Sequence, residues 1–150
     1  MSSETDCAIR ARIEPGGVVR VVTRNLTVRA DGRLSLDPDA TLPSALDLLM
    51  SALATDLVAG FAREAARERI TIHDLELRLA ARLDHPLAAL GVVGETGGPE
   101  VSEIRGTLDV TGDADEPQWR LVWSRVLGRA TVHATLGRAV ELHITLQPLP

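Results

Sequence analysis

Residues 45–62 form the longest nearly uncharged run of the sequence, and this run most constrains the fold. Its apolar residues fall on almost every face of a helix, which is typical of a helix buried at the centre of a protein. Ser44 and Asp47 fit a capping box, so a helix is expected over 46–67. Because Asp47 and Asp56 interrupt the run, it is marginal as a membrane span. We therefore expect a long buried helix and no membrane insertion.

Before this helix, the first forty residues alternate between apolar and polar, the pattern of half-buried strands. Alternation places one set of side chains on an apolar face (Ile9, Ala11, Ile13) and the next set on a polar face (Arg10, Arg12, Glu14). Turns are expected at 15–17 and at Asp31–Gly32, after which Leu34 and Leu36 close the meander. The sequence thus predicts a three-stranded antiparallel sheet.

After the helix, strand alternation returns over 70–83, 104–110 and 140–146, with a slip at His73–Asp74 that suggests a bulge. Glycines and prolines over 84–100 predict a long mobile loop. An amphipathic helix is expected from Asp115, with Trp119 and Trp123 on its core-facing stripe, and a short turn over 132–136. No repeats or linkers interrupt the chain, so one domain of the α+β class is expected over 1–150.

Composition excludes several kinds of chemistry. The single cysteine, Cys7, allows neither a two-cysteine thiol enzyme nor a cysteine-based metal site or disulfide framework. Every basic residue is arginine, so Schiff-base chemistry on lysine is excluded. A net charge of −5, scattered arginines and three aromatic residues argue against nucleic-acid binding.

The remaining signals point to an ordinary soluble chain. The four histidines have no metal-ligand spacing, so neither a metal nor another cofactor is expected. The polar N-terminus lacks the features of a signal peptide, which favours a cytoplasmic protein.

Two segments give the chain a family resemblance. Residues 43–62 resemble the central-helix motif of the OsmC/Ohr family, roughly P-x-E-L-L-L-x-A-L-x-x-C, and residues 129–136 resemble its second motif, roughly K-C-P-V-H-x-T-L. The resemblance implies an OsmC-like fold, with antiparallel sheets wrapped around a long buried central helix in an intertwined homodimer. It also implies interfacial sites that reduce organic hydroperoxides with a pair of cysteines. In this chain the two cysteine positions fall on Asp56 and Ala130.

The resemblance nominates site residues as well. Asp56 is the candidate acid, base or nucleophile; alternatively it forms a structural ion pair, for which Arg63 lies on the same helix face. The acidic residue of the family motif matches Asp47, which is also the expected helix cap. Arg20 and Arg24 are candidates for the family's arginine.

The candidate ligand-binding residues are Thr55, Ala130 and His133. His133 occupies a motif position, although a solvated turn would equally explain it. Trp119 and Trp123 are interpreted as core residues because the apolar stripe already accounts for them.

These observations favour a stress-response or detoxification homologue of the OsmC/Ohr family that has lost thiol peroxidase chemistry. It would keep a pocket at a homodimer interface for a small apolar or hydroperoxide-like ligand. Three alternatives stay open: a non-thiol enzyme such as a hydrolase that uses Asp56, a residual organic hydroperoxide reductase, and a purely structural or interaction role.

Overall fold

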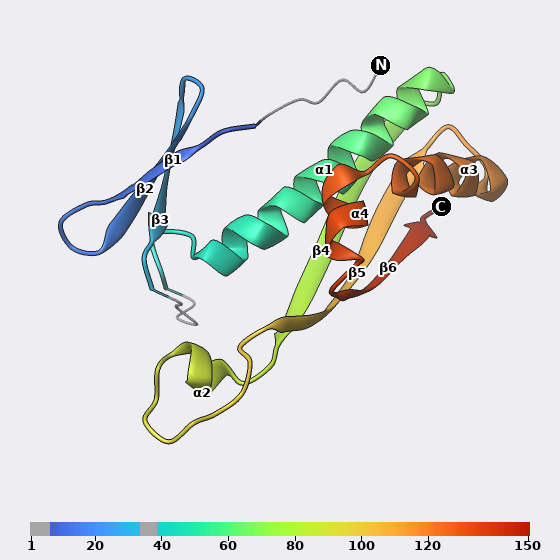
Figure 1. Cartoon of the computed structure of the whole chain (residues 1–150). Coiled ribbons are helices and arrows are strands. Elements are labelled where there is room, and N and C mark those ends of the chain that lie inside the picture. Colours follow the sequence, from blue (N-terminus) through green and yellow to red (C-terminus); the bar gives the residue numbers. More distant parts are fainter. Residues whose placement is uncertain (1–6, 34–38) are drawn as a thin grey trace, which may run out of the picture. The chain divides into compact units, whose positions relative to one another are not determined.

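Six strands and four helices make up the part of the chain that the computed structural model describes, residues 7–33 and 39–150 (Figure 1). This mixture of sheets and helices confirms the predicted α+β class. The chain divides into two compact units, residues 1–49 and 50–150, each of which is described by itself. A single domain over 1–150 stays a prediction.

The N-terminal unit holds the predicted three-stranded antiparallel sheet, in which β1 (Arg10–Ile13), β2 (Val18–Thr23) and β3 (Leu26–Asp31) are neighbours in that order. The turn between β2 and β3 lies at Arg24–Asn25, with Arg24 at φ 50°. The turn between the second and third strands of the sheet is therefore Arg24–Asn25 and not Asp31–Gly32 as predicted.

Asp31 is instead the last residue of β3, and Gly32 follows it. Asp31 Oδ1 accepts a hydrogen bond from the Arg33 backbone N–H (2.9 Å), and the Gly32 N–H donates to the Gly17 carbonyl (3.0 Å). A Cβ at Gly32 would lie 2.4 Å from that carbonyl oxygen, so only glycine fits this approach. The predicted strand around Leu34 and Leu36 lies outside the described residues.

Helix α1 (Ala45–Arg67) confirms the predicted central helix. Its buried positions follow one stripe: Leu53, Leu57, Gly60, Phe61, Glu64 and Ala65. Among the described helices, α1 alone has the length and hydropathy of a membrane span, and 22% of its most apolar window is buried within the chain. The stripe enters the hydrophobic core, so α1 is a core helix with other faces left partly exposed.

The C-terminal unit is built on a second sheet of β4 (Ile72–Leu83), β5 (Val101–Gly112) and β6 (Glu141–Pro148), with β5 in the centre. The predicted slip at His73 is confirmed by a register shift between Ile72 and Asp74. β4 and β5 are antiparallel, but β5 and β6 are parallel. The antiparallel pairing that the resemblance implies holds for every other strand pair of the described residues and fails only for β5 and β6. A parallel neighbour needs a crossover connection, and the two helices between β5 and β6 supply it.

Those two helices differ in how they begin. In α3 (Glu116–Leu127), Asp115 and Gln118 form a capping box, and the predicted apolar stripe is buried. Phe61 of α1 stacks on Trp119 with ring centroids 5.7 Å apart, so both α1 and α3 contribute to one core. α4 (Thr131–Leu136) is a short helix where the sequence predicts a turn.

The 84–100 segment is more structured than a plain loop. It contains a short helix, α2 (Pro86–Ala89), and its base is closed by a hydrogen bond from the Asp84 N–H to the Glu100 carbonyl (2.9 Å). The prediction of a long loop is therefore corrected to a closed excursion between β4 and β5. Its mobility stays a prediction.

Candidate functional site

Asp56 lies half-buried on α1, and its carboxylate faces the start of α4. Asp56 Oδ2 accepts hydrogen bonds from the backbone N–H groups of Val132 (2.8 Å) and His133 (3.2 Å). The N-cap residue of α4 is Ala130, whose side chain offers no acceptor. Helix starts need such acceptors for their free N–H groups, and the positive end of a helix favours a carboxylate. Asp56 therefore caps a helix that begins 75 positions away in the sequence.

The α1 face around Asp56 is shaped to receive the α3–α4 junction. Gly60 follows one turn after Asp56, and a Cβ there would lie 3.2 Å from Val126 Cγ1. Buried Glu64 comes one turn later, and its Oε1 accepts hydrogen bonds from Arg67 Nη1 and Arg129 Nη1, each at 2.7 Å. The Arg129 hydrogen bond is the main reason that the pKa of Glu64 lies below its ordinary value. Two carboxylates thus hold the junction on either side of a glycine.

A small pocket remains between these groups. Its volume is about 20 Å³, and it is lined by Asp56, Gly60, Arg63, Glu64, Val126, Arg129 and Ala130. A space of this size holds about one water molecule. Although Arg63 lines the pocket, the described residues contain no ion pair between Arg63 and Asp56, so that predicted pairing is wrong. The backbone N–H groups of α4 take its place.

The structure gathers only part of the predicted ligand-binding set. Asp56 and Ala130, the two positions that match the family cysteines, line the same pocket. Thr55 is exposed on the neighbouring face of α1. The side chain of His133 lines a different, open depression of about 510 Å³ with residues 137–143. Only the backbone of His133 takes part in the Asp56 arrangement.

Asp47 occupies the helix-capping position that the sequence predicts. Its Oδ2 accepts hydrogen bonds from the Ser44 hydroxyl (2.7 Å) and the Ser44 backbone N–H (2.8 Å), while the Asp47 N–H donates to Ser44 Oγ (3.2 Å). These hydrogen bonds, led by that of the hydroxyl, hold the pKa of Asp47 below its ordinary value. The capping role is confirmed, and a catalytic role stays a prediction.

Arg20, the other predicted catalytic residue, belongs to β2 of the N-terminal sheet. Its Nε lies 3.0 Å from Glu14 Oε1 in an ion pair. Arg24 lies in the turn that follows the same strand. Because the two units are described separately, a site shared by Arg20 and Asp56 stays a prediction.

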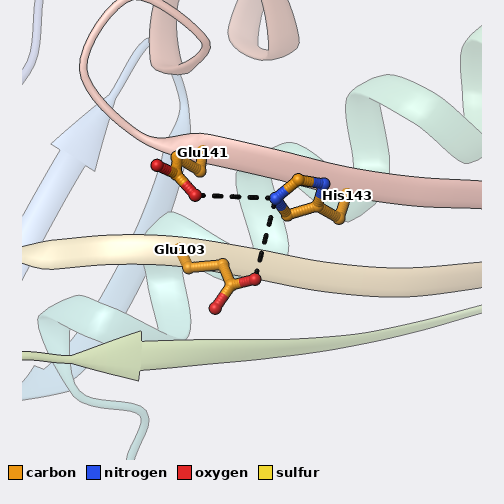
Figure 2. Close-up of side chains that lie close together, drawn as sticks. All are labelled: Glu103, Glu141 and His143. Atoms are coloured by element: carbon orange, nitrogen blue, oxygen red, sulfur yellow. Dashed lines mark ion pairs between the residues drawn. The ribbon is translucent and has the colours of Figure 1, made fainter.

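A second polar cluster lies on the C-terminal sheet, although the spacing of the histidines along the chain does not predict a metal site there. The strand register places Glu103 of β5 beside Glu141 and His143 of β6 (Figure 2). His143 Nε2 lies 3.7 Å from Glu103 Oε1 and 3.6 Å from Glu141 Oε2. Two carboxylates and an imidazole are metal ligands by type. The alternation along β6 predicts from sequence that Glu141 and His143 lie on the same outward face. Glu103 joins them only through the pairing of β5 with β6, which the sequence does not reveal.

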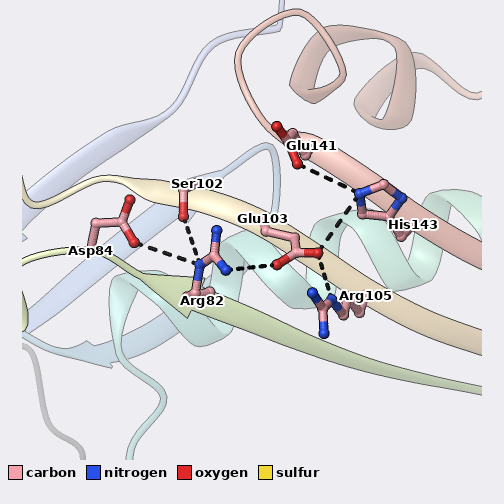
Figure 3. Close-up of polar contacts among 7 residues, drawn as sticks. All are labelled: Arg82, Asp84, Ser102, Glu103, Arg105, Glu141 and His143. Carbon is pink, nitrogen blue, oxygen red and sulfur yellow. Dashed lines mark hydrogen bonds and ion pairs between the residues drawn. The ribbon is translucent and has the colours of Figure 1, made fainter.

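Two arginines already neutralise buried Glu103 (Figure 3). Arg105 Nε donates to Glu103 Oε1 at 2.5 Å, and Arg82 Nη1 lies 3.2 Å from Glu103 Oε2. The hydrogen bond from Arg105 is the main reason that the pKa of Glu103 is lowered. A divalent cation here would lie beside two fixed positive charges, which repel it. The cluster is accounted for as an ion-pair network of the sheet.

Comparison with known proteins identifies the family of the chain. A family model described as OsmC-like protein matches residues 38–145, which include both motif segments, α1 and the α3–α4 junction. The chain belongs to the OsmC-like protein family. The resemblance seen in the two motifs is thereby confirmed.

Solved structures of this family share the fold at low sequence identity. An OsmC-like protein from Mycoplasma pneumoniae has a TM-score of 0.80 at 17% identity, covering 98% of this chain and 99% of that chain. An organic hydroperoxide resistance protein OsmC from Legionella pneumophila has a TM-score of 0.66 at 9% identity, covering 97% of this chain and 99% of that chain. The organic hydroperoxide resistance protein OhrB of Bacillus subtilis has a TM-score of 0.57 at 16% identity, with 95% and 98% covered. No curated protein matches the sequence.

Proposed function

We propose that this OsmC-like protein is a cytoplasmic homodimer that binds a small apolar molecule at its subunit interface without two-cysteine peroxidase chemistry. One observation carries the proposal: Asp56 and Ala130 stand at both family cysteine positions, and the Asp56 carboxylate is occupied by the N–H groups of α4. A position that serves as the nucleophile in the family pattern serves here as a helix cap.

The remaining cysteine supports the loss of that chemistry. Cys7 is exposed, precedes β1 and is the only cysteine of the sequence. A two-cysteine cycle needs a thiolate that attacks the peroxide and a second thiol that closes the disulfide. This chain offers no second thiol, so turnover through an intrachain disulfide is ruled out.

Exposed apolar surface supports the homodimer. Sheet alternation places Ile9, Ile13, Leu26 and Val28 on one face of the N-terminal sheet, and Ile13 is 73% and Leu26 65% exposed. Large exposed apolar patches are rare on monomers and mark interaction surfaces. A second copy of the chain is the partner we propose for this face.

The size of the Asp56 pocket supports an interfacial ligand site. Its volume of about 20 Å³ lies far below the roughly 300–1,000 Å³ of small-molecule sites. A ligand site at this place therefore needs walls from a second chain. Exposed Thr55 would join such a composite site together with Ala130 and His133. The hydroperoxide resistance proteins among the structural neighbours support a setting in stress response or detoxification.

A peroxidase assay tests the proposal directly. Purified protein is mixed with an organic hydroperoxide and a dithiol reductant, and peroxide consumption is followed for the wild type and Cys7→Ser. We expect both to remain at the background rate. Sustained turnover that survives Cys7→Ser contradicts the loss of thiol chemistry, whereas turnover that disappears in this variant identifies a residual one-cysteine reductase.

Native mass spectrometry tests the ligand site. We expect a two-chain species, some of which carries a co-purified apolar molecule that is lost when the interface is disrupted. A species of one chain at micromolar concentration contradicts the proposed interface.

A further inference from the structure

One face of the N-terminal sheet carries an unusual row of arginines. The register places Arg12 of β1 directly opposite Arg20 of β2, and Arg20 directly opposite Arg29 of β3. Arg10 lies two residues before Arg12, so strand alternation places it on the same face. Like charges directly opposite one another destabilise a sheet. This row therefore needs a compensating charge.

Carboxylates of the same face compensate only part of it. Glu14 forms ion pairs with Arg20 (3.0 Å) and Arg29 (3.4 Å). Asp31 shares the face, but its Oδ1 accepts the Arg33 backbone N–H. Within residues 7–33 and 39–150, neither Arg10 nor Arg12 has an ion-pair partner. Among the described residues of this face, four arginines against two carboxylates leave two positive charges on a chain whose net charge is −5.

The C-terminal sheet shows the opposite arrangement on its polar face. Arg78 pairs with Asp109. Both Arg82 and Arg105 pair with Glu103, as Figure 3 shows. There each cross-strand arginine has a carboxylate partner. The absence of lysine therefore does not by itself leave arginines unpaired. Of the two sheets, the N-terminal one carries the arginines whose charge is not compensated.

Arg10 and Arg12 surround a hollow together with Arg20, which is paired with Glu14. Arg10, Arg12, Arg20 and Val22 line a space of about 120 Å³ on this face. A guanidinium donates paired N–H groups that match the oxygens of a phosphate or carboxylate. The space is large enough for a polyatomic anion, and three side chains offer donors from two strands.

We propose that this hollow binds the phosphate group of a small phosphorylated molecule. A phosphomonoester carries about −1.5 to −2 charges at pH 7, which matches the two uncompensated positive charges. A ligand with a single carboxylate would neutralise only one of these two positive charges. The site lies entirely within the N-terminal unit, and Arg20 is the one residue that it shares with the predicted catalytic set.

The test uses phenyl phosphate as the probe and benzoate as its carboxylate counterpart. Each is titrated into the isotope-labelled full chain at low salt, and backbone amide shifts are followed by NMR up to about 10 mM ligand. We expect saturable shifts in β1 and β2 with phenyl phosphate and at least roughly tenfold weaker binding of benzoate. No saturation with phenyl phosphate, or equal affinity for benzoate, overturns the phosphate assignment.

Arginine variants distinguish specific binding in the hollow from non-specific electrostatic attraction of the anion to the N-terminal unit. Arg12→Gln and Arg10→Gln should each weaken phenyl phosphate binding by about tenfold. Arg33→Gln removes the same charge from the same unit outside the hollow and should change the affinity less than about twofold. Equal losses in all three variants overturn the proposal.

Thermal unfolding of the free variants adds a second readout. Because Arg12→Gln removes a like-charge contact with Arg20, we expect its melting temperature to equal or exceed that of the wild type. A variant that is less stable and also binds weakly would indicate a structural role, and contradicts the proposal. A final experiment measures binding to vesicles with and without phosphatidic acid. Binding only to vesicles that contain phosphatidic acid, together with no binding of phenyl phosphate, would assign the site to a lipid headgroup and overturn the proposed soluble ligand.

Discussion

The Oδ2 atom of Asp56 lies 2.8 Å from the backbone nitrogen of Val132 and accepts its N–H. This hydrogen bond joins the middle of α1 to the first turn of α4, between residues 76 positions apart in the sequence. It occurs where the family motif has its first cysteine. Asp56 therefore caps α4, and this role explains why an acidic residue stands in an apolar helix.

Removal of the Asp56 carboxylate should destabilise the fold moderately. Asp56→Ala leaves the N–H groups of Val132 and His133 without their acceptor, and lost helix caps cost about 0.5–2 kcal/mol. Asp56→Asn keeps a carbonyl oxygen and should cost less. Urea unfolding measures both values, and Thr55→Ala on the exposed neighbouring position is the matched control. An effect of Asp56→Ala no larger than that of the control contradicts the capping role.

The same Asn variant discriminates between capping and catalysis. If Asp56 acts as an acid, base or nucleophile, Asp56→Asn should abolish any hydrolytic activity while the chain stays folded. We expect the wild type and Asp56→Asn to behave alike in a broad substrate screen. Activity present only in the wild type would support the non-thiol enzyme.

Gly60 should tolerate a methyl group but no larger side chain. A Cβ would lie 3.2 Å from Val126 Cγ1, a tight contact that opposes the gain of about 1 kcal/mol from replacing glycine in a helix. Gly60→Ala should therefore be close to neutral. Gly60→Val overpacks the α1–α3 contact and should cost about 1–3 kcal/mol. Ala62→Val, on an exposed position of α1, controls for helix propensity, and equal costs at both positions would contradict the close packing.

Acid should weaken the hold of α1 on the α3–α4 junction. The pKa of Glu64 is lowered in the folded protein, chiefly by its hydrogen bond from Arg129, relative to an ordinary value of 4.5. Its contribution is therefore complete above that value and is lost as pH falls through the lower folded pKa. Glu64→Gln should reduce stability at neutral pH and make the acid side of the stability curve less steep.

Urea midpoints measured from neutral pH to about pH 3 follow this change. Glu95→Gln, on the exposed 84–100 excursion, provides the control and should leave the curve unchanged. Glu103 continues to contribute an acid dependence of its own, since its pKa is lowered by Arg105. Parallel curves for the wild type and Glu64→Gln would contradict the proposed linkage.

The apolar face of the N-terminal sheet should control the oligomeric state. Ile13→Glu or Leu26→Glu places a charge on the surface that we assign to the subunit interface, and burial of an unpaired charge is strongly unfavourable. Light scattering should then give the mass of one chain where the wild type gives two. Val93→Glu is the control because Val93 is fully exposed on the 84–100 excursion. Dissociation by the control, or none by either variant, contradicts the assigned interface.

The sequence alone determined much of the local structure, because local structure depends on periodicity and on nearby side chains. Apolar periodicity located α1, α3 and the main strands, and the Ser44–Asp47 pair and Asp115 marked two helix starts. Two motif segments together identified the family. The turn at Arg24–Asn25 was missed because Asp31–Gly32 carries the stronger local turn signal.

Tertiary structure decided what depends on residues distant in the chain. α4 was predicted as a turn because its cap comes from Asp56 and leaves no local signature. Asp56 was paired with Arg63 by helix periodicity, yet the fold brought backbone N–H groups closer. Strand register likewise placed Glu103 next to Arg82 and Arg105, and it placed Arg12 directly opposite Arg20. Sequence thus determined the helices and strands that have a local signature, whereas long-range packing decided α4 and the partner of each charged side chain, since hydrogen bonds and ion pairs act only over a few ångströms.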